Sequence, residues 1–508
     1  MKEGRLQQGT VTGLPFMNNG EMITVSRKTG RLDRNHLLLQ IKKAAVIGSH
    51  GGIRMNILVI NGSPKGEYSI TLQTALYLKN RHPEHTFEVL HAGQRIKALE
   101  KDFAPALAAI EKADLLLFAY PVYTFIAPCQ LHRFIELMKE HKAPVAGKYM
   151  SQISTSKHFY DVTAHRYVQD NAQDMGMKTL RGLSADMDDL LTEKGQQEAE
   201  LFLTHVLWCM EQGYSEPDQL LNVPYEPKAV QAPKDSAEKT AEEKTGDVVI
   251  VADLLPEDTQ LSLMIERFRQ VMPRRTRVIN LREYPFKGGC LGCFNCATDG
   301  KCIYKDGFDD FLRNQVQSGE AIVYAFTIRD HSMGARFKMY DDRQFCNGHR
   351  TVTVGMPVGY LVSGHYQAES NLQTILEGRS QVGQNPLAGV ATDETDPDAA
   401  IDQMADTLQR MLEIRYHQPK NFLGVGGMKI FRDLIYQMQG MMKADHRFYK
   451  QHGEYDFPQK KKGLILKMYL VGALLSSPKL KAKMGNKMNE GMIGPYRKVV
   501  EATGKKRG

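Results

Sequence analysis

The chain has 508 residues, of which 42% are hydrophobic and 24% are charged, and it contains a single tryptophan. This composition is typical of globular proteins and excludes disordered and fibrous ones, while the length predicts two or three domains. The formal net charge of +8 is concentrated in residues 417–508, which hold 19 Lys and Arg against 6 Asp and Glu.

Three cysteines, Cys129, Cys209 and Cys346, are scattered without a pairing pattern, and no secretory leader stands at the N-terminus. Both features predict a cytoplasmic location. The longest apolar run near the C-terminus, GLILKMYLVGALL, is shorter than the roughly 20 residues that span a bilayer, so no membrane crossing is expected. The basic C-terminal residues lack a nucleic-acid fold signature, and they are consistent with weak contact with an acidic protein or an anionic membrane surface.

Residues 1–54 show little periodicity and are interpreted as an N-terminal extension outside the fold. From Met55 to residue 213, short apolar runs alternate with helical stretches, beginning with NILVIN and ITLQTALYLKNR. Strands with so little polar alternation must be covered on both faces, which is the condition of a parallel sheet between helices. Residues 55–213 are therefore predicted to form a doubly wound α/β domain.

Residues 214–246 are rich in Pro, Glu and Lys and lack an apolar face, which predicts a linker. The cycle of strands and helices then repeats over residues 247–416. The segment PCQLHRFIELMK, after the third strand of the first domain, is matched by MGARFKMYDDR at the same place in the second. We interpret this repeat as an internal duplication. Residues 417–508 are predicted to be a basic, helical C-terminal region.

The first strand leads through the loop VINGSPKGEYSIT into the first helix. A loop rich in Gly, Ser and Thr at this point directs backbone N–H groups and hydroxyls at the helix N-terminus, where the helix dipole favours an anion. Ser63, Ser69 and Thr71 supply hydroxyls, and Lys65 supplies positive charge. The loop therefore predicts a phosphate site, although it matches neither the dinucleotide nor the nucleotide fingerprint.

Two loops resemble the flavin loops of the flavodoxin-like NADPH-dependent FMN reductases and iron–sulfur flavoproteins: GSPKGEYSIT after the first strand and PVYTFIAPCQLHRFIE after the third. The resemblance implies that the FMN phosphate is bound by Ser63, Lys65, Ser69 and Thr71. It also implies that the isoalloxazine ring is bordered by Pro121, Val122, Tyr123, Thr124 and Phe125. Because the carboxyl ends of parallel strands share one sheet edge, the segment after the fourth strand adds three further flavin or substrate contacts, Thr155, Ser156 and His158.

Four cysteines follow the second strand of the second domain with the spacing C-x2-C-x2-C-x5-C: Cys290, Cys293, Cys296 and Cys302. Zinc sites usually separate two ligand pairs by about a dozen residues or more, whereas three thiolates two residues apart suit one cubane cluster. The spacing favours a [4Fe–4S] cluster, with zinc and metal-free thiols as alternatives. It also resembles the cluster-binding loop of iron–sulfur flavoproteins.

The two domains differ at the positions where each would bind a cofactor. At the phosphate-loop position the second domain has DLLPEDTQLS, in which Asp253, Glu257 and Asp258 would repel a phosphate. The first domain has no cysteine where the cysteine loop would lie. In the family, the resemblance implies a dimer in which the cluster of one subunit lies near the FMN of the other. We interpret the chain as an intramolecular pseudo-dimer with one FMN and one cluster.

The predicted fold class is thus α/β, with two tandem flavodoxin-like doubly wound parallel sheets and a helical, basic C-terminal region. The first functional hypothesis is a flavin oxidoreductase that passes electrons between FMN and a [4Fe–4S] cluster. The donor would be NAD(P)H or a ferredoxin-like protein, and the acceptor a small quinone, nitro or enone compound. Two alternatives stay open: an NAD(P)H-dependent FMN reductase without a functional cluster, and a non-enzymatic electron-transfer protein. No pattern predicts a catalytic triad.

Overall fold

The computed structural model describes residues 17–18, 21–22, 54–218, 224–231, 244–458, 461–475 and 479. The chain divides into two units, Met1–Arg54 and Met55–Gly508. In the first unit, strand β1 (Met17–Asn18) pairs antiparallel with β2 (Glu21–Met22). The prediction that residues 1–54 form an extension concerns, for the most part, residues outside this description.

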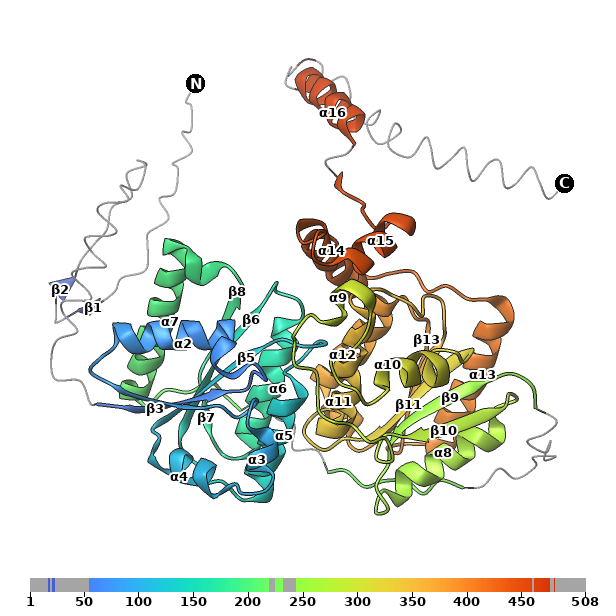
Figure 1. The fold of residues 1–508 in the computed structure, drawn as a ribbon, viewed down its shortest axis with the longest axis horizontal. Coiled ribbons are helices and arrows are strands. Elements are labelled where there is room, and N and C mark those ends of the chain that lie inside the picture. Colours follow the sequence, from blue (N-terminus) through green and yellow to red (C-terminus); the bar gives the residue numbers. More distant parts are fainter. Residues whose placement is uncertain are drawn as a thin grey trace, which may run out of the picture. The chain divides into compact units, whose positions relative to one another are not determined.

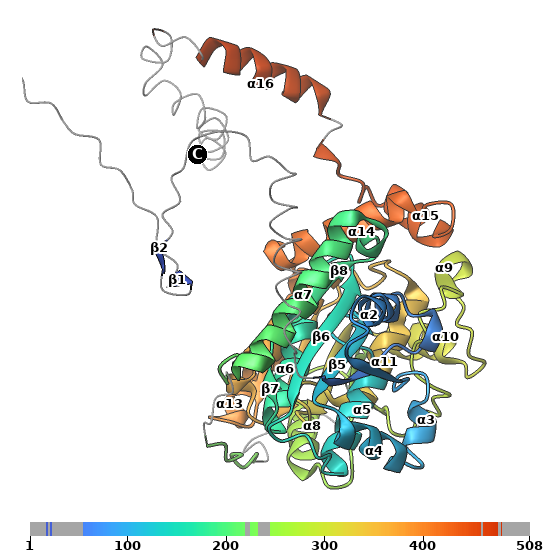
Figure 2. The same cartoon turned by 90° about the vertical axis from the view of Figure 1, so that its left-hand side faces the viewer.

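The first half of the second unit contains a parallel sheet with the strand order β4–β3–β5–β6–β7, in which β8 also pairs with β6 (Figure 1). Its strands are β3 (Asn56–Asn61), β4 (Thr86–Leu90), β5 (Leu115–Pro121), β6 (Tyr149–Ser156), β7 (Lys178–Thr179) and β8 (Leu183–Asp186). Its helices are α2 (Ile70–Arg81), α3 (Ile96–Leu99), α4 (Ala104–Lys112), α5 (Cys129–Glu140), α6 (Asp161–Asp174) and α7 (Glu193–Gln212). Figure 2 shows α2 and α7 lying over one face of this sheet.

The second half contains a parallel sheet with the strand order β10–β9–β11–β12–β13. Its strands are β9 (Val248–Asp253), β10 (Thr276–Asn280), β11 (Ala321–Thr327), β12 (Val358–Ser363) and β13 (Leu387–Thr392). Its helices are α8 (Thr259–Val271), α9 (Cys296–Asp299), α10 (Phe308–Phe311), α11 (Gly334–Arg343), α12 (Ser370–Gly383) and α13 (Pro397–Ile414). Within each half, the strands lie in the order second, first, third, fourth, fifth, which is the flavodoxin-like arrangement. The predicted fold class is confirmed.

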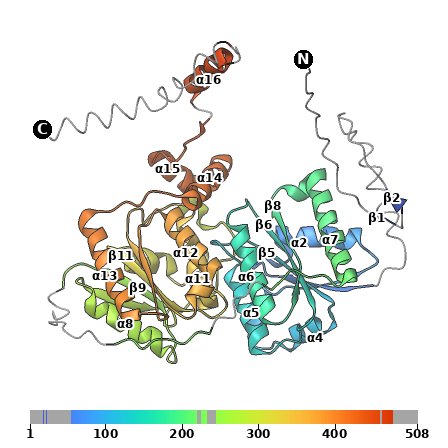
Figure 3. The same ribbon diagram turned by 180° about the vertical axis from the view of Figure 1, so that it is seen from behind.

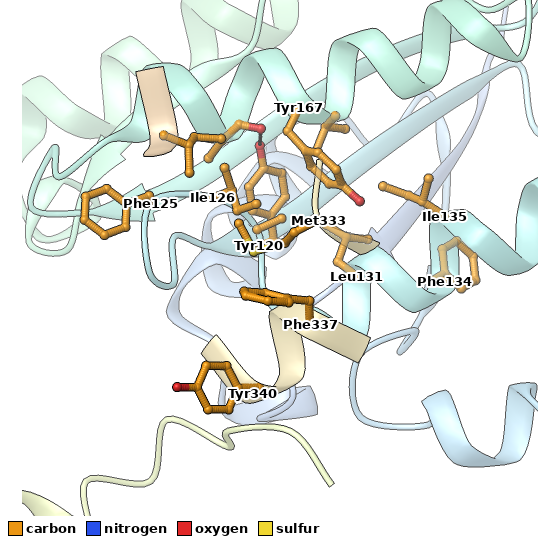
Figure 4. Close-up of a cluster of buried hydrophobic side chains, with 14 of the residues drawn as sticks. Tyr120, Phe125, Ile126, Leu131, Phe134, Ile135, Tyr167, Met333, Phe337 and Tyr340 are labelled. Carbon is orange, nitrogen blue, oxygen red and sulfur yellow. Dashed lines mark hydrogen bonds between the residues drawn. The ribbon is translucent and has the colours of Figure 1, made fainter. Parts of the chain in front are cut away.

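The two sheets share a hydrophobic core. In β3, Ile57 and Val59 pack under α2 and α7, whereas Leu58 and Ile60 belong to a cluster that continues into the second half. Helices α5 and α6 meet α11 and α12 in this region (Figure 3). Figure 4 shows Phe337 and Met333 of the second half in one cluster with Leu131 and Tyr120 of the first. Neither half could expose this surface to water without losing a large hydrophobic contribution.

Helices α5 and α11 cap one another. The backbone N–H of Cys129, in the first turn of α5, donates to Asp342 Oδ2 at 2.8 Å, and the N–H of Ala335, in the first turn of α11, donates to Glu136 Oε1 at 2.7 Å. Glu136 stands seven residues after Cys129 in α5, and Asp342 stands seven residues after Ala335 in α11. The two capping contacts are therefore equivalent. This reciprocity is the geometry of a twofold dimer interface, here within one chain. A carboxylate at a helix N-terminus is stabilised by the helix dipole.

A buried polar network also joins the halves. Asp330 accepts hydrogen bonds from the Tyr167 hydroxyl and the Gly334 N–H, and it lies 2.7 Å from His132 Nδ1. Burial alone would raise the pKa of Asp330, but His132 and these hydrogen bonds outweigh it and lower the pKa. Asp330 is therefore a carboxylate inside the core. Its hydrogen bonds with Tyr167 of the first half and Gly334 of the second fix the position of one half against the other.

The C-terminal region adds helices α14 (Phe422–Gln437), α15 (Lys443–Gln451) and α16 (Lys462–Leu475). Met428, Ile435, Met442 and Tyr449 are buried in the core that the two sheets share, so α14 and α15 belong to the same fold. In α16, six apolar side chains from Leu464 to Leu470 are exposed to water. Among the described residues, no helix has the length and apolar content that would let it cross a membrane.

The pairing of His331 predicts a pH dependence of stability. Its Nδ1 lies 2.8 Å from Glu369 and its Nε2 lies 2.8 Å from Asp174 in the other half. Burial alone would lower the pKa of His331, but these two carboxylates outweigh it and raise the pKa to about 10. The stabilisation is therefore complete below the unfolded pKa near 6.5 and is lost as the pH rises through about 10.

Between those two values, the free energy of unfolding should fall with rising pH by up to about 1.4 kcal/mol per unit. Denaturant unfolding of the wild type and of His331→Gln over this pH range checks the prediction. The variant should lose this slope, and equal slopes in both proteins would contradict it.

Candidate functional site

The loop between β3 and α2 is shaped by hydrogen bonds from its own residues. Asn61 donates through Nδ2 to the Gly66 carbonyl at 2.9 Å and accepts the Ser63 N–H through Oδ1 at 3.2 Å. The Ser69 hydroxyl accepts the Leu72 N–H at 3.3 Å and so caps α2. Gly66 has a φ of 56°, which a glycine adopts at little cost. The loop thus wraps the N-terminus of α2, where an anion is favoured.

The loop after β5 makes a tight turn that the second half holds in place. Tyr123 and Ile126 form an isolated antiparallel bridge, and between them Thr124 and Phe125 have φ values of 44° and 75°. Two consecutive residues other than glycine with positive φ are strained by about 1–3 kcal/mol each. Lys338 donates to the Tyr123 carbonyl at 2.8 Å, and Thr124 donates to Asp342 Oδ1 at 3.2 Å. Residues of α11 therefore stabilise a strained loop of the first half.

The cysteine loop of the second half lies directly on the loops of the first half. Gln130 of α5 donates to the Cys290 carbonyl at 3.1 Å. A Cβ on Gly289 would stand 2.1 Å from the Cys129 sulfur, and one on Gly292 would stand 1.9 Å from the Tyr123 hydroxyl. Only glycine fits at these two positions, because any side chain would separate the loops.

Arg343 of α11 joins the two ends of the cysteine loop. Its guanidinium donates to the Gly288 carbonyl at 2.9 Å and to both carboxylate oxygens of Asp306, at 2.7 and 2.9 Å. The same group lies 4.6 Å from the Tyr304 ring centroid and 4.7 Å from that of Phe308. A fully buried arginine thus fixes the loop at its base.

These loops enclose one cavity of about 410 Å³. The predicted residues that line it are Ser63, Lys65, Ser69, Thr71, Pro121, Val122, Tyr123, Thr124, Phe125, Thr155, Ser156, Cys290, Cys293, Cys296 and Cys302. His158 does not line it; its Nδ1 lies 2.9 Å from Asp161 instead. The structure therefore brings both sets of predicted residues, the flavin loops and the cysteines, to one cavity.

Several lining residues were not predicted from the sequence. Cys346, just after α11, is a buried fifth thiol on the cavity wall, and Phe159 and Phe431 are apolar lining groups. The sequence offers one signal for Lys338 and Asp342, which hold the flavin loop. They are oppositely charged residues four positions apart on a helix that is expected to be packed on both sides. No comparable sequence signal marks Cys346 or Phe431.

The thiols of the cavity have raised pKa values. Burial raises the pKa of Cys296 to about 11 and that of Cys346 to about 12, and it raises the pKa of Cys290 as well. The Gly292 N–H, 3.4 Å from the Cys290 sulfur, opposes this effect. Iron or zinc binds thiolates, so metal binding here would release protons.

The cysteine sulfurs are not gathered around the centre of one ion. Among the described residues, the one group of three or more ligand atoms within 4.8 Å of each other is His82, Glu84 and His85. Two sulfurs on one zinc ion, at about 2.3 Å each, can lie no more than about 4.6 Å apart. No three sulfurs of the described cysteines meet this limit in the structure. At His85, Nδ1 accepts the Met55 N–H at 3.2 Å, which leaves the proton on Nε2, the nitrogen facing Glu84.

In the second half, the position that corresponds to the phosphate loop is filled by internal ion pairs. Asp258 accepts the Leu255 N–H at 2.8 Å and pairs with Arg329 at 2.6 Å. Asp253, at the end of β9, pairs with Arg282. The acidic residue directly before α8 is thus engaged within the chain itself.

Comparisons with known proteins match part of the chain. Residues 55–187 match the family model of NADPH-dependent FMN reductase. The match spans strands β3 to β8 of the first half of the fold.

Individual relatives cover about a third of the chain. An iron–sulfur flavoprotein from Archaeoglobus fulgidus is 25% identical over 175 residues, which are 32% of this chain and 78% of that protein. Among solved structures, the NAD(P)H:quinone oxidoreductase from Methanothermobacter marburgensis is 12% identical, with 32% of this chain and 100% of that chain covered and a TM-score of 0.26. FerB, a flavoenzyme NAD(P)H:(acceptor) oxidoreductase from Paracoccus denitrificans, is 15% identical, with 31% and 98% covered and a TM-score of 0.27.

The contacts of Asp342 predict an effect of the second half on the binding of FMN by the first half. In Asp342→Asn, the Thr124 turn and the α5 N-terminus lose the charge that holds them, so the affinity for FMN should fall by about tenfold. Glu136→Gln is a matched control, because it removes the reciprocal cap at the other end of the same helix pair. Fluorescence titration of the two apoproteins with FMN checks this, and equal affinities in both variants would contradict it.

Proposed function

We propose that the chain is an FMN-dependent oxidoreductase that passes electrons between FMN in the first half and a [4Fe–4S] cluster on the cysteine loop of the second half. NAD(P)H or a ferredoxin-like protein would be the donor, and a small molecule such as a quinone would be the acceptor. The observation that carries the proposal is that the flavin loops and all four cysteines of the C-x2-C-x2-C-x5-C loop line one cavity.

The residues of the first half fit FMN. Lys65 stands in the loop at the α2 N-terminus. In the described part of the chain, it is the one lysine or arginine of the cavity wall that has no carboxylate partner. This suits a single phosphate group. Thr155 has a buried hydroxyl oxygen that makes no hydrogen bond with any described residue. Since buried polar atoms are rarely left without a partner, Thr155 is suited to bind a polar edge of a ligand in the cavity.

The residues of the second half fit an iron–sulfur cluster. Four thiols border the cavity, and glycines with positive φ at residues 288, 292 and 300 let the backbone wrap around a bound group. The Gly292 N–H already points at the Cys290 sulfur, which is the type of hydrogen bond that tunes a cluster. Arg343 keeps the two ends of the loop together and so limits the motion of its thiols.

FMN supplies chemistry that accepts an electron pair and releases single electrons, and a cluster supplies single-electron transfer. The chain's own residues would bind and orient both groups and cover the cavity that holds them. Tyr123 and Lys65 both lie against the cysteine loop: a Cβ on Gly292 would stand 1.9 Å from the Tyr123 hydroxyl and 3.2 Å from Lys65 Cε. The second half contributes no second flavin site, because Asp258 and Arg329 occupy the phosphate position with each other.

Anaerobic purification followed by metal, sulfide and flavin analysis tests the proposal. The wild type should contain one FMN and about four iron atoms per chain, the iron number being that of one cubane cluster. Protein with two flavins per chain, or with no iron, would contradict the proposal. Reduction by NADPH and by reduced ferredoxin, followed in the visible spectrum, identifies the donor.

Two substitutions should separate the cofactors. Cys293→Ala should remove the iron and keep the FMN, whereas Cys209→Ala, a thiol on α7 away from the cavity, should change neither. Ser69→Ala should weaken FMN binding by about tenfold and keep the iron. Thr192→Ala removes a similar helix cap, on Gly195 of α7, and serves as the control for the loss of a cap alone. Loss of both cofactors from one substitution would mean unfolding and would count against separate sites.

A further inference from the structure

The roof of the cavity comes from the C-terminal region, outside residues 55–187 that match the FMN reductase family. Its lining residues are Ile430, Phe431 and Leu434 of α14, Met442, and Asp445 of α15. We propose that this roof, with Phe431 as the specificity-determining residue, forms the acceptor subsite and restricts it to uncharged, planar, apolar molecules. The proposal rests on the proposed function of the same cavity.

Helix α14 bridges the two halves. Phe431 stacks on Phe159 of the first half, with ring centroids 4.5 Å apart, and meets His349 of the second half edge to face at 4.7 Å. The Tyr160 hydroxyl donates to the Leu423 carbonyl at 3.1 Å. One aromatic ring from each half of the chain thus contacts Phe431, and these contacts give the roof a fixed aromatic surface.

Close packing brings α14 to this position. A Cβ on Gly427 would stand 2.6 Å from Val382 of α12 and 3.0 Å from Phe159, and one on Gly424 would stand 2.9 Å from the Gln381 carbonyl. The two glycines stand three residues apart on one side of α14. They allow the helix to approach α12 closely, as Figure 1 shows for these two helices.

Helix α15 ties the roof to the segment after Cys346. The buried Asp445 accepts the His349 N–H at 3.2 Å and pairs with Arg350 at 3.2 Å. The Tyr449 hydroxyl donates to the His349 carbonyl at 3.1 Å. The roof is therefore anchored by an ion pair and hydrogen bonds, and it forms a fixed wall of the cavity.

The described lysines and arginines of the cavity wall provide no unpaired positive charge for an anionic acceptor once Lys65 binds the FMN phosphate. Each lining lysine or arginine other than Lys65 has a carboxylate partner among the described residues: Lys157 with Asp186 and Asp188, Arg343 with Asp306, Arg350 with Asp445, and Arg379 with Asp341. Lys65 is needed for the FMN phosphate. An anionic acceptor would be desolvated under an apolar roof without a partner, which is costly. The wall therefore selects neutral molecules.

Equilibrium binding of a matched pair of probes tests this selection. The oxidised holoprotein is titrated by calorimetry with 1,4-naphthoquinone and with 1,4-naphthoquinone-2-sulfonate, which add the same ring system without and with a charge. The neutral quinone should bind at least about tenfold more tightly. Equal or tighter binding of the sulfonate would overturn the proposed charge selection.

Substitutions on α14 test the role of the roof. Phe431→Ala should weaken binding of 1,4-naphthoquinone by about tenfold, and Phe431→Leu, which retains an apolar side chain, should have a smaller effect. Phe422→Ala is the matched control, because Phe422 stands on the same helix and is 85% exposed. Unchanged quinone binding in Phe431→Ala would overturn the proposal.

The FMN and iron contents of each variant are measured beside the binding. If the wild type lacks FMN or iron, the proposed function fails, whatever the binding of the quinone. If the cofactors are present and Phe431→Ala still binds the quinone like the wild type, only the acceptor subsite fails. A variant that loses its FMN is replaced in the comparison by Phe431→Leu, and equal binding in that variant also contradicts the proposal.

Discussion

The structure depends on the reciprocal capping of α5 and α11. Each helix begins after the third strand of its own sheet, and each receives at its N-terminus a carboxylate from the other helix, Asp342 on Cys129 and Glu136 on Ala335. Because the helix N-termini lie at the carboxyl ends of the strands, this contact turns the ligand-binding edges of both sheets toward a common cavity. The hydrophobic cluster between the sheets then fixes the arrangement, since neither half can bury that surface alone.

Within this symmetric frame, the two halves have become chemically different. At the start of α2, the first half leaves the backbone and Lys65 open to an anion, whereas the second half fills the equivalent place with Asp258 and Arg329. The cysteine loop after β10 has no counterpart in the first half, and its glycines fit against Tyr123 and Cys129. The strained turn at Thr124 depends on Lys338 and Asp342 of the other half. The loops of the first half are thus completed by residues of the second half.

The C-terminal helices change the character of the cavity. The loops at the edge of an open sheet face water, but here α14 and α15 cover the cavity between them with apolar side chains that are anchored at His349 and Phe159. Asp445 takes up the charge of Arg350 below this cover. The cover joins both halves and adds apolar side chains to the wall of the cavity between the flavin loops and the cysteines.

The sequence by itself determined the two parallel sheets, because uninterrupted apolar strands alternating with helices have few other ways to bury both faces. It also identified the loop at the α2 N-terminus and the cysteine spacing, since both are local patterns along the chain. Tertiary structure alone decided that the two meet in one cavity, that Lys338 and Asp342 hold the flavin loop, and that Cys346 and Phe431 line the wall. These contacts join residues up to several hundred positions apart, and local periodicity carries no information about which distant surfaces complement each other.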